Sequence, residues 1–351
     1  VKVAILGTLS KLLDKGGPML RPFLPQLQTT FVKSLSSEHS RVRSSAVSAL
    51  RKLMKLSARV DPLVSDLSNT ASAESIEAAV RVSALQALSV VFEVNGAKIS
   101  QPTLAEKCVP FLSNDRVILH RDTKVRVIAS RTLVKAIALL CDDTQPQFFQ
   151  GHVVKRVVSL SADLSAGLES HVAALLATAG LRYCQTVACG EPFAILKGAI
   201  LKMYEHSRAH DMGTLRAACA AGLGELLACQ LSEHTVLAPL LVTALQDKLP
   251  DSRVGAMRGI RHAARNAGAD GLPMPCIQQL VEPVYTCTTD SKEHVSLAAD
   301  QTLLRLLQVR EDPEKMKNFV RACSSPSTGR AVAEYCRKSL ANVELEESDV
   351  E

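Results

Sequence analysis

The chain has 351 residues, with 41 Lys and Arg against 35 Asp and Glu, and a formal net charge of +6. Hydrophobic residues make up 47% and aromatic residues only 3%, and Trp is absent. Aliphatic side chains and Ala must therefore form the core. Such a core favours close helix–helix packing and argues against a β-sandwich or barrel, whose strands are rich in β-branched and aromatic residues. The modest basic excess excludes a histone-like surface.

One sequence pattern recurs along the chain and predicts a series of similar helices. An apolar residue is followed by a basic residue, and small or apolar residues then stand at offsets that share one helical face. Clear copies begin at Val1, Val42, Val80, Val125, Leu215 and Val295, and weaker ones at Ser170, Ser252 and Val332. The intervals of 37–45 residues match the HEAT and armadillo periods. The pattern predicts that Leu50, Leu88, Leu133, Leu223 and Leu303 are buried.

A second helix is expected in each repeat, often opened by Pro, which is tolerated in a first helical turn. These helices are predicted over Arg21–Leu35 and from Asp61, Glu191, Ala238 and Glu282. Two helices per repeat favour HEAT over the three-helix armadillo repeat. We expect an all-α, HEAT-repeat (ARM-type) α-solenoid of about nine helix pairs, continuous over residues 1–343. Residues 344–351 are expected to form an acidic, disordered tail, and the chain is expected to be a fragment of a longer protein.

The sequence predicts no enzyme, cofactor or metal site. Phosphate-loop, zinc-protease, nucleophile-elbow and dinucleotide motifs are absent from the sequence. The ten Cys include no C-x-x-C pair, and the closest two are Cys184 and Cys189, near His171. Because no second pair stands nearby, reduced core thiols are predicted rather than a zinc site. No uncharged apolar run reaches about 18 residues, so no membrane span is predicted.

A basic residue occupies the second position of most repeats, and two roles for it stay open. In HEAT arrays such an Arg commonly bonds an acidic residue six positions earlier; here Arg253 has Asp247, but Arg81 has Ser75 and Arg126 has His120. The Arg residues are then either a structural ladder or a stripe that binds carboxylate or phosphate. With a nearby basic cluster, the candidate partner-binding residues are Arg43, Arg81, Arg116, Arg121, Lys124 and Arg126. The basic cluster is either a solvated face or a contact for a phosphate-rich partner, and no interleaved aromatic residues support base reading.

The segment RPFLPQLQTTFVKSL, followed by RVRSSAVSALRKL and VDPL, resembles the C-terminal HEAT array of the general control translational activator (Gcn1) family. The resemblance is strongest over Val1–Leu63, and beyond it rests on the order of the repeats. It implies a cytoplasmic, ribosome-associated, non-catalytic scaffold that activates the kinase of initiation factor 2 alpha during amino-acid starvation. The implied partners are the RWD-containing kinase, a family co-activator and the ribosome, with no small-molecule substrate. The kinase-binding segment is expected mainly upstream of this chain. The alternative is a HEAT segment of a nuclear transport receptor or phosphatase scaffold.

Overall fold

The computed structural model describes residues 1–57, 59–187, 189–267, 271–306, 329–332 and 334–335, and these residues form helices and turns without any strand. The chain divides into two compact units, residues 1–156 and 157–351. Each unit consists of a row of second helices from successive repeats, with first helices packed along the row. The all-α repeat fold predicted from the sequence is confirmed.

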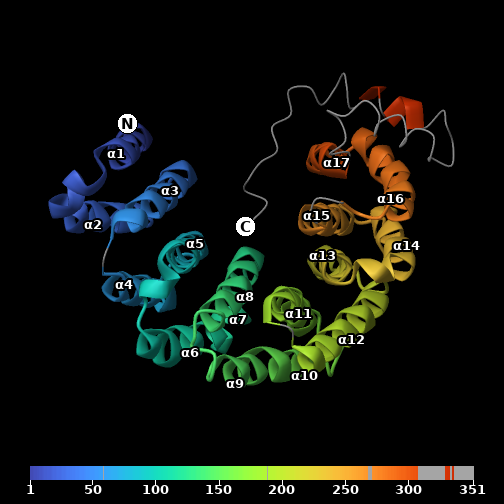
Figure 1. Cartoon of the computed structure of the whole chain (residues 1–351), viewed down its shortest axis with the longest axis horizontal. Helices are drawn as coiled ribbons and strands as arrows, with labels where there is room; N and C mark the ends of the chain where they lie inside the picture. The colour runs from blue at the N-terminus through green and yellow to red at the C-terminus, as the bar shows by residue number, and fades with distance from the viewer. Residues whose placement is uncertain (58, 188, 268–270, 307–328, 333, 336–351) are drawn as a thin grey trace. The chain divides into compact units, whose positions relative to one another are not determined.

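In unit 1, four second helices lie side by side in chain order (Figure 1). They are α1 (Lys2–Gly16), α3 (Ser40–Leu56), α5 (Ala78–Asn95) and α8 (Thr123–Ile137). The first helices that pack on α3, α5 and α8 are α2 (Leu24–Ser34), α4 (Asp61–Ser72) and the π-helical turn η3 (Thr103–Cys108) continued by α6 (Val109–Ser113). The short α7 (Asp115–Ile118) precedes α8, and α9 (Gln145–Phe149), η4 (Gln150–Val154) and the start of α10 (Lys155–Leu160) follow it.

Unit 2 repeats the same arrangement (Figure 1). Its row of second helices is α11 (Gly167–Val187), α13 (Gly213–Cys229), α15 (Pro250–Asn266) and α17 (Glu293–Leu306). The first helices are α12 (Gly190–Ser207), α14 (His234–Leu245) and α16 (Met274–Thr286). Short 3-10 turns complete the connections of both units: η1 (Gly17–Phe23), η2 (Gly96–Lys98), η5 (Leu231–Glu233) and η6 (Cys287–Thr289).

The second helices form where the repeated pattern predicts them. Helices α3, α5, α8, α13 and α17 each begin two residues before the first apolar position of the pattern. Their patterned Leu residues face the first helices and the neighbouring second helices, and all five are fully buried: Leu50, Leu88, Leu133, Leu223 and Leu303. Eight of the nine predicted second helices are present among the described residues; the ninth, predicted from Val332, falls largely outside them.

The predicted starts of the first helices are right to within one residue for two helices and displaced for three. Helix α4 begins at Asp61 and α12 at Gly190, as the Pro rule predicts. Over Arg21–Leu35 a 3-10 turn comes first and α2 begins only at Leu24. Helices α14 and α16 begin four and eight residues before the predicted starts, with Pro239 and Pro283 inside them. In α16 the Pro in the first turn is Pro275, so Pro283 costs one internal hydrogen bond but does not stop the helix.

Helices α13 and α15 cross so closely that a side chain would not fit at the glycine positions of the crossing. A Cβ added to Gly224 would stand 2.2 Å from the Cα of Gly259. A Cβ on Gly255 would stand 2.3 Å from the carbonyl oxygen of Ala217. Glycines at the crossing therefore permit backbone contact between these two second helices.

The cysteines that the structure describes are mostly core residues. Cys108, Cys184, Cys219, Cys276 and Cys287 are buried, Cys189 and Cys229 are half-buried, and Cys141 is exposed. Burial raises the pKa of the Cys108 and Cys219 thiols to about 12. Among the described residues, no three His, Cys, Asp or Glu side chains gather as a metal site requires.

One stretch of the described chain, Ala78–Lys98, is long and apolar enough to cross a membrane. It contains α5, which packs between α3 and α8, and 61% of its apolar 18-residue window is buried inside the protein. Helices α13 and α14 together reach such a length only across a bend of 117°. Burial in the row of second helices accounts for the apolar composition of α5.

Candidate interaction surface

The Arg residues at the second position of the repeats turn toward the loop that precedes their own helix. In unit 1, Arg43 donates to the carbonyl oxygens of Ser37 and Glu38, at 2.7 and 2.9 Å. Arg126 donates in the same way to the carbonyl oxygens of His120 and Arg121, at 2.7 and 2.8 Å. These bonds satisfy carbonyls of the turn, so the position has a structural function in both repeats.

Two of the candidate residues lie inside the protein rather than on a binding face. Arg81 is only 6% exposed and Arg126 only 4%. Burial lowers the pKa of both guanidinium groups, because it penalises the charged form. Both groups still carry their charge at neutral pH, because a guanidinium is not deprotonated in proteins. Their charges are thus held at the turns, where a flat partner surface cannot reach them.

The ladder in unit 2 runs between repeats, not within one repeat as the sequence suggested. From Asp247, six residues earlier, Arg253 contacts the backbone and not the carboxylate: its guanidinium donates to the carbonyl oxygen at 2.6 Å. The Asp247 carboxylate instead accepts two hydrogen bonds from Arg216 of the preceding repeat, at 2.7 and 2.9 Å. Arg253 pairs forward with Asp290 of the next repeat, at 2.7 Å. In both cases the acid six residues before the second position of a repeat pairs with the Arg of the repeat before it.

The remaining candidates are exposed and lie near the turn between α7 and α8. Arg116, Arg121 and Lys124 are all on the surface. Arg116 pairs with Glu74, and both side chains of that pair are more than three-quarters exposed. Arg116 therefore brings little net charge, whereas Arg121 and Lys124 extend a basic surface at the start of α8.

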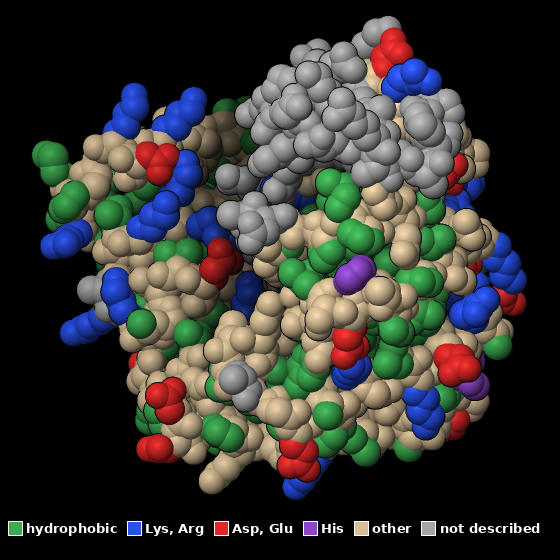
Figure 2. All heavy atoms as spheres, turned by 45° about the vertical axis from the view of Figure 1, so that its right-hand side comes forward, with side chains coloured by type: hydrophobic (Ala, Val, Ile, Leu, Met, Phe, Trp, Pro, Cys, Tyr) green, Lys and Arg blue, Asp and Glu red, His purple; other side chains and the backbone are tan. Residues whose placement is uncertain are grey.

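A larger basic surface, which the sequence analysis did not single out, covers the second helices of unit 1. Helices α1, α3, α5 and α8 carry thirteen Lys and Arg against two acidic residues. The second helices α11, α13, α15 and α17 of unit 2 carry seven against five. Figure 2 shows Lys and Arg side chains gathered over the N-terminal helices, at the left of the view. We call this surface the basic row; its partly or fully exposed members include Lys15, Arg51, Lys52, Lys55, Lys124, Arg131 and Lys135.

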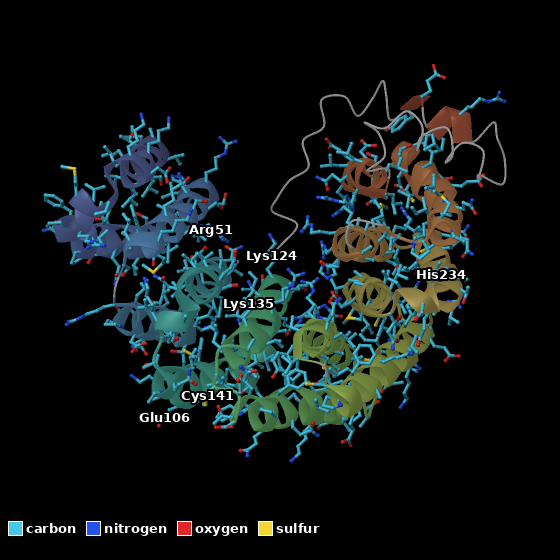
Figure 3. The ribbon with its side chains drawn as sticks, in the orientation of Figure 1. Arg51, Glu106, Lys124, Lys135, Cys141 and His234 are labelled. Carbon is cyan, nitrogen blue, oxygen red and sulfur yellow. The ribbon has the colours of Figure 1, made fainter. Side chains whose placement is uncertain are left out.

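Ion pairs connect neighbouring helices along the basic row. Lys52 of α3 pairs with Asp14 of α1 at 2.5 Å. Arg51 of α3 pairs with Glu93 of α5 at 2.7 Å, and Lys135 of α8 approaches the other oxygen of Glu93 at 3.7 Å. The hydrogen bond from Arg51 is the main reason that the pKa of Glu93 is lowered. Figure 3 shows Arg51, Lys124 and Lys135 on the side of unit 1 that α3, α5 and α8 form.

The basic row could have been found by counting charges one predicted helix at a time. Helix α3 contains five Lys and Arg and no acidic residue, and α8 contains four and none. The whole-chain total hides this excess, because acidic residues elsewhere offset it. A surface with an excess of exposed Lys and Arg attracts polyanions.

Comparison with known proteins identifies the family of this repeat array. The family model described as "Stalled ribosome sensor GCN1-like, HEAT repeats" matches residues 61–350. The chain belongs to the GCN1-like HEAT-repeat family. The match begins where the resemblance noted in the sequence becomes weaker, so the GCN1-like character extends over the repeats of both units. This membership supports the leading interpretation over a nuclear transport receptor or phosphatase scaffold.

Three curated relatives illustrate the range of similarity between this chain and known proteins. Protein ILITYHIA of Arabidopsis thaliana is 30% identical over 325 residues, which are 90% of this chain and 11% of the relative. The stalled ribosome sensor GCN1 of Homo sapiens is 28% identical over 349 residues, 97% of this chain and 12% of the relative. The eIF-2-alpha kinase activator GCN1 of Saccharomyces cerevisiae is 41% identical over 102 residues, 29% of this chain and 4% of the relative. The chain thus spans only a small part of the length of the curated relatives it matches.

Proposed function

We propose that this chain is a non-catalytic docking segment of a cytoplasmic, ribosome-associated activator of the kinase of initiation factor 2 alpha. The proposal is supported by membership of the GCN1-like family, whose relatives are named as a stalled ribosome sensor and as an eIF-2-alpha kinase activator. A HEAT array presents equivalent positions of successive repeats as one extended surface. The RWD-containing kinase and a family co-activator are the expected protein partners of the longer protein, with the kinase contact mainly upstream of this segment.

The observation that carries the docking proposal is the charge of the basic row. Four adjacent helices of unit 1 carry an excess of eleven positive charges, of which only Arg81 and Arg126 are buried, whereas the matching row in unit 2 has an excess of two. No Phe, Tyr or Trp is present on α1, α3 or α8, and the one on α5, Phe92, is 3% exposed. A face with many cations and no aromatic anchor suits the phosphate backbone of ribosomal RNA better than bases or a protein hot spot.

Ribosome co-sedimentation at increasing salt tests this proposal. We expect the Lys15→Gln/Lys55→Gln/Lys124→Gln variant to bind ribosomes more weakly and with a salt slope reduced by about one for each phosphate contact removed. The matched control is Lys202→Gln/Arg258→Gln/Lys292→Gln, which removes three exposed charges from unit 2. Equal losses in the two triple variants would contradict a specific role for the basic row.

A further inference from the structure

The residue six positions before the second position of the repeat pattern closes the turn in the same way in three repeats. Asp247 accepts the backbone N–H of Leu249, and Asp290 accepts that of Lys292, both at 2.9 Å. In unit 1 the ring Nδ1 of His120 accepts the backbone N–H of Asp122 at 3.0 Å. His120 therefore accepts the same backbone hydrogen bond as the two Asp residues, but its ring is neutral when Nδ1 is an acceptor.

The two Asp residues also neutralise a buried Arg of the preceding repeat. The side chains of Arg216 and Asp247 are 7% and 11% exposed, and they meet at 2.7 Å. Those of Arg253 and Asp290 are 15% and 13% exposed, and they too meet at 2.7 Å. A charge withdrawn from water in this way is costly unless an opposite charge accompanies it.

Arg81 occupies the position that Arg216 and Arg253 take in unit 2, in the repeat before that of His120. No carboxylate in the part of the chain that the structure describes forms a salt bridge with it. It is 6% exposed, and among the described residues its one hydrogen bond runs from Nη2 to the carbonyl oxygen of Ala73, at 2.8 Å. Its Nε has no acceptor, but neither has that of Arg253, so the missing carboxylate is what sets the two repeats apart. Burial, and then the charge of Arg81, lower the pKa of His120, which keeps the ring neutral.

A hollow opens at the position where the carboxylate is missing. It has a volume of about 470 Å³ and is lined by Arg81, His120, Asn114 and Arg116, with Val117 and Glu74 among the other lining residues. The repeat-equivalent hollow of unit 2, about 450 Å³, is lined by Arg253 and Thr286 and contains Asp290. Both hollows lie at the same place in the repeat and contain a position-two Arg. They differ because the hollow of unit 2 has the carboxylate of Asp290 where the hollow of unit 1 has the ring of His120.

We propose that the hollow at Arg81 binds a carboxylate from an acidic side chain of a partner protein, in the position that Asp290 takes beside Arg253. Arg81 supplies the charge, and the ring Nε2–H of His120 and the amide of Asn114 supply further donors. A carboxylate is favoured over a phosphate because the same chain fills the equivalent site with Asp. Glu74 at the rim also repels a doubly charged phosphate more strongly than a singly charged carboxylate. The site is separate from the proposed RNA contact on the second helices, because Arg81 is the one residue among these lining residues that belongs to a second helix.

Acetate is the simplest probe of the site, and the methyl group of Val117 is a local reporter. We expect a saturable methyl NMR shift of Val117 as acetate replaces chloride at constant ionic strength in the full 351-residue chain. His120→Asp installs the internal carboxylate, so the saturable shift should be lost. His120→Asn keeps a turn-closing acceptor without charge and should retain the shift. Glu74→Gln should lower the acetate concentration at half-saturation.

The reciprocal variant tests the same logic in unit 2. Asp290→His removes the anion from Arg253 and should give the methyl group of Thr286 a saturable acetate shift that the unchanged chain lacks. A Val117 shift that is absent, or that survives in His120→Asp, overturns the proposal, as does saturation by inorganic phosphate but not by acetate. Ribosome co-sedimentation of His120→Asp should be unchanged, so failure of the carboxylate site and failure of RNA docking are separable.

Discussion

Single side chains in the second helices determine much of the stability of this array. Leu50 is fully buried between α3 and its neighbours. Leu50→Ala should therefore lower the free energy of unfolding by about 2–5 kcal/mol, the range for a large side chain removed from a core. Urea denaturation measures the loss. Leu297→Ala is the control, because Leu297 is 53% exposed and should change stability by less than about 0.5 kcal/mol.

The ladder between repeats makes a second prediction at the residue scale. Asp247→Asn keeps the shape of the side chain but leaves the buried Arg216 charge without its carboxylate. We expect a loss of about 3 kcal/mol in unfolding free energy, as for other broken buried pairs. Asp142→Asn removes an exposed carboxylate and serves as the control. Equal stability of the two variants would mean that carbonyl acceptors alone satisfy Arg216.

Helix contacts within unit 2 depend on glycine at the crossing of α13 and α15. Gly224→Ala would place a methyl group 2.2 Å from the backbone of Gly259, so the helices must separate. The expected cost is about 1–3 kcal/mol, as for overpacked cores. Gly198→Ala in α12 meets no atom within 4 Å and should instead stabilise the helix by up to about 1 kcal/mol. Thermal unfolding of the two variants should therefore shift in opposite directions.

The contacts between α3, α5 and α8 should weaken in acid. The pKa of Glu93 is lowered, mainly by the hydrogen bond from Arg51. The Glu93 contribution is therefore fully present above the ordinary pKa of 4.5 and is lost as the pH falls through the lowered value. Because Glu93 is 37% exposed, we expect less than about 1 kcal/mol. Urea midpoints measured from neutral to acidic pH should fall less steeply for Glu93→Gln than for the unchanged chain.

The sequence predicted the helices better than the contacts between them. The Val-Arg pattern located α3, α5 and α8 because local periodicity determines which face of a helix is buried. It could not show that Arg216 pairs with Asp247 or Arg51 with Glu93, because those pairs join residues 31 and 42 positions apart that meet only when repeats stack. Pro283 was misread as a helix start because an earlier Pro275 in the same segment fits that role equally well.

At the scale of the whole molecule, the basic residues and the buried Arg–Asp pairs are distributed unequally between the two units. The second helices of unit 1 carry the basic excess, whereas the forward Arg–Asp pairs lie in unit 2. A family match over residues 61–350 covers parts of both units, so it does not by itself separate their roles. The two units differ in charge, because the excess of Lys and Arg lies on the second helices of unit 1 and the buried Arg–Asp pairs at the turns lie in unit 2.

The forward Arg–Asp pairs have a consequence for how the array opens. In a repeat protein each repeat is held only by its neighbours, so a missing link between two repeats lowers the cost of local opening there. The turns around Glu74 and His120 are joined by the exposed Arg116–Glu74 pair but lack a buried pair like that of Arg253 with Asp290. Their amide hydrogens should exchange with deuterated water sooner than those around Asp247 and Asp290. A partner carboxylate at Arg81 would supply the missing link, so occupancy of the hollow would be detectable as slower exchange in backbone that the partner never touches.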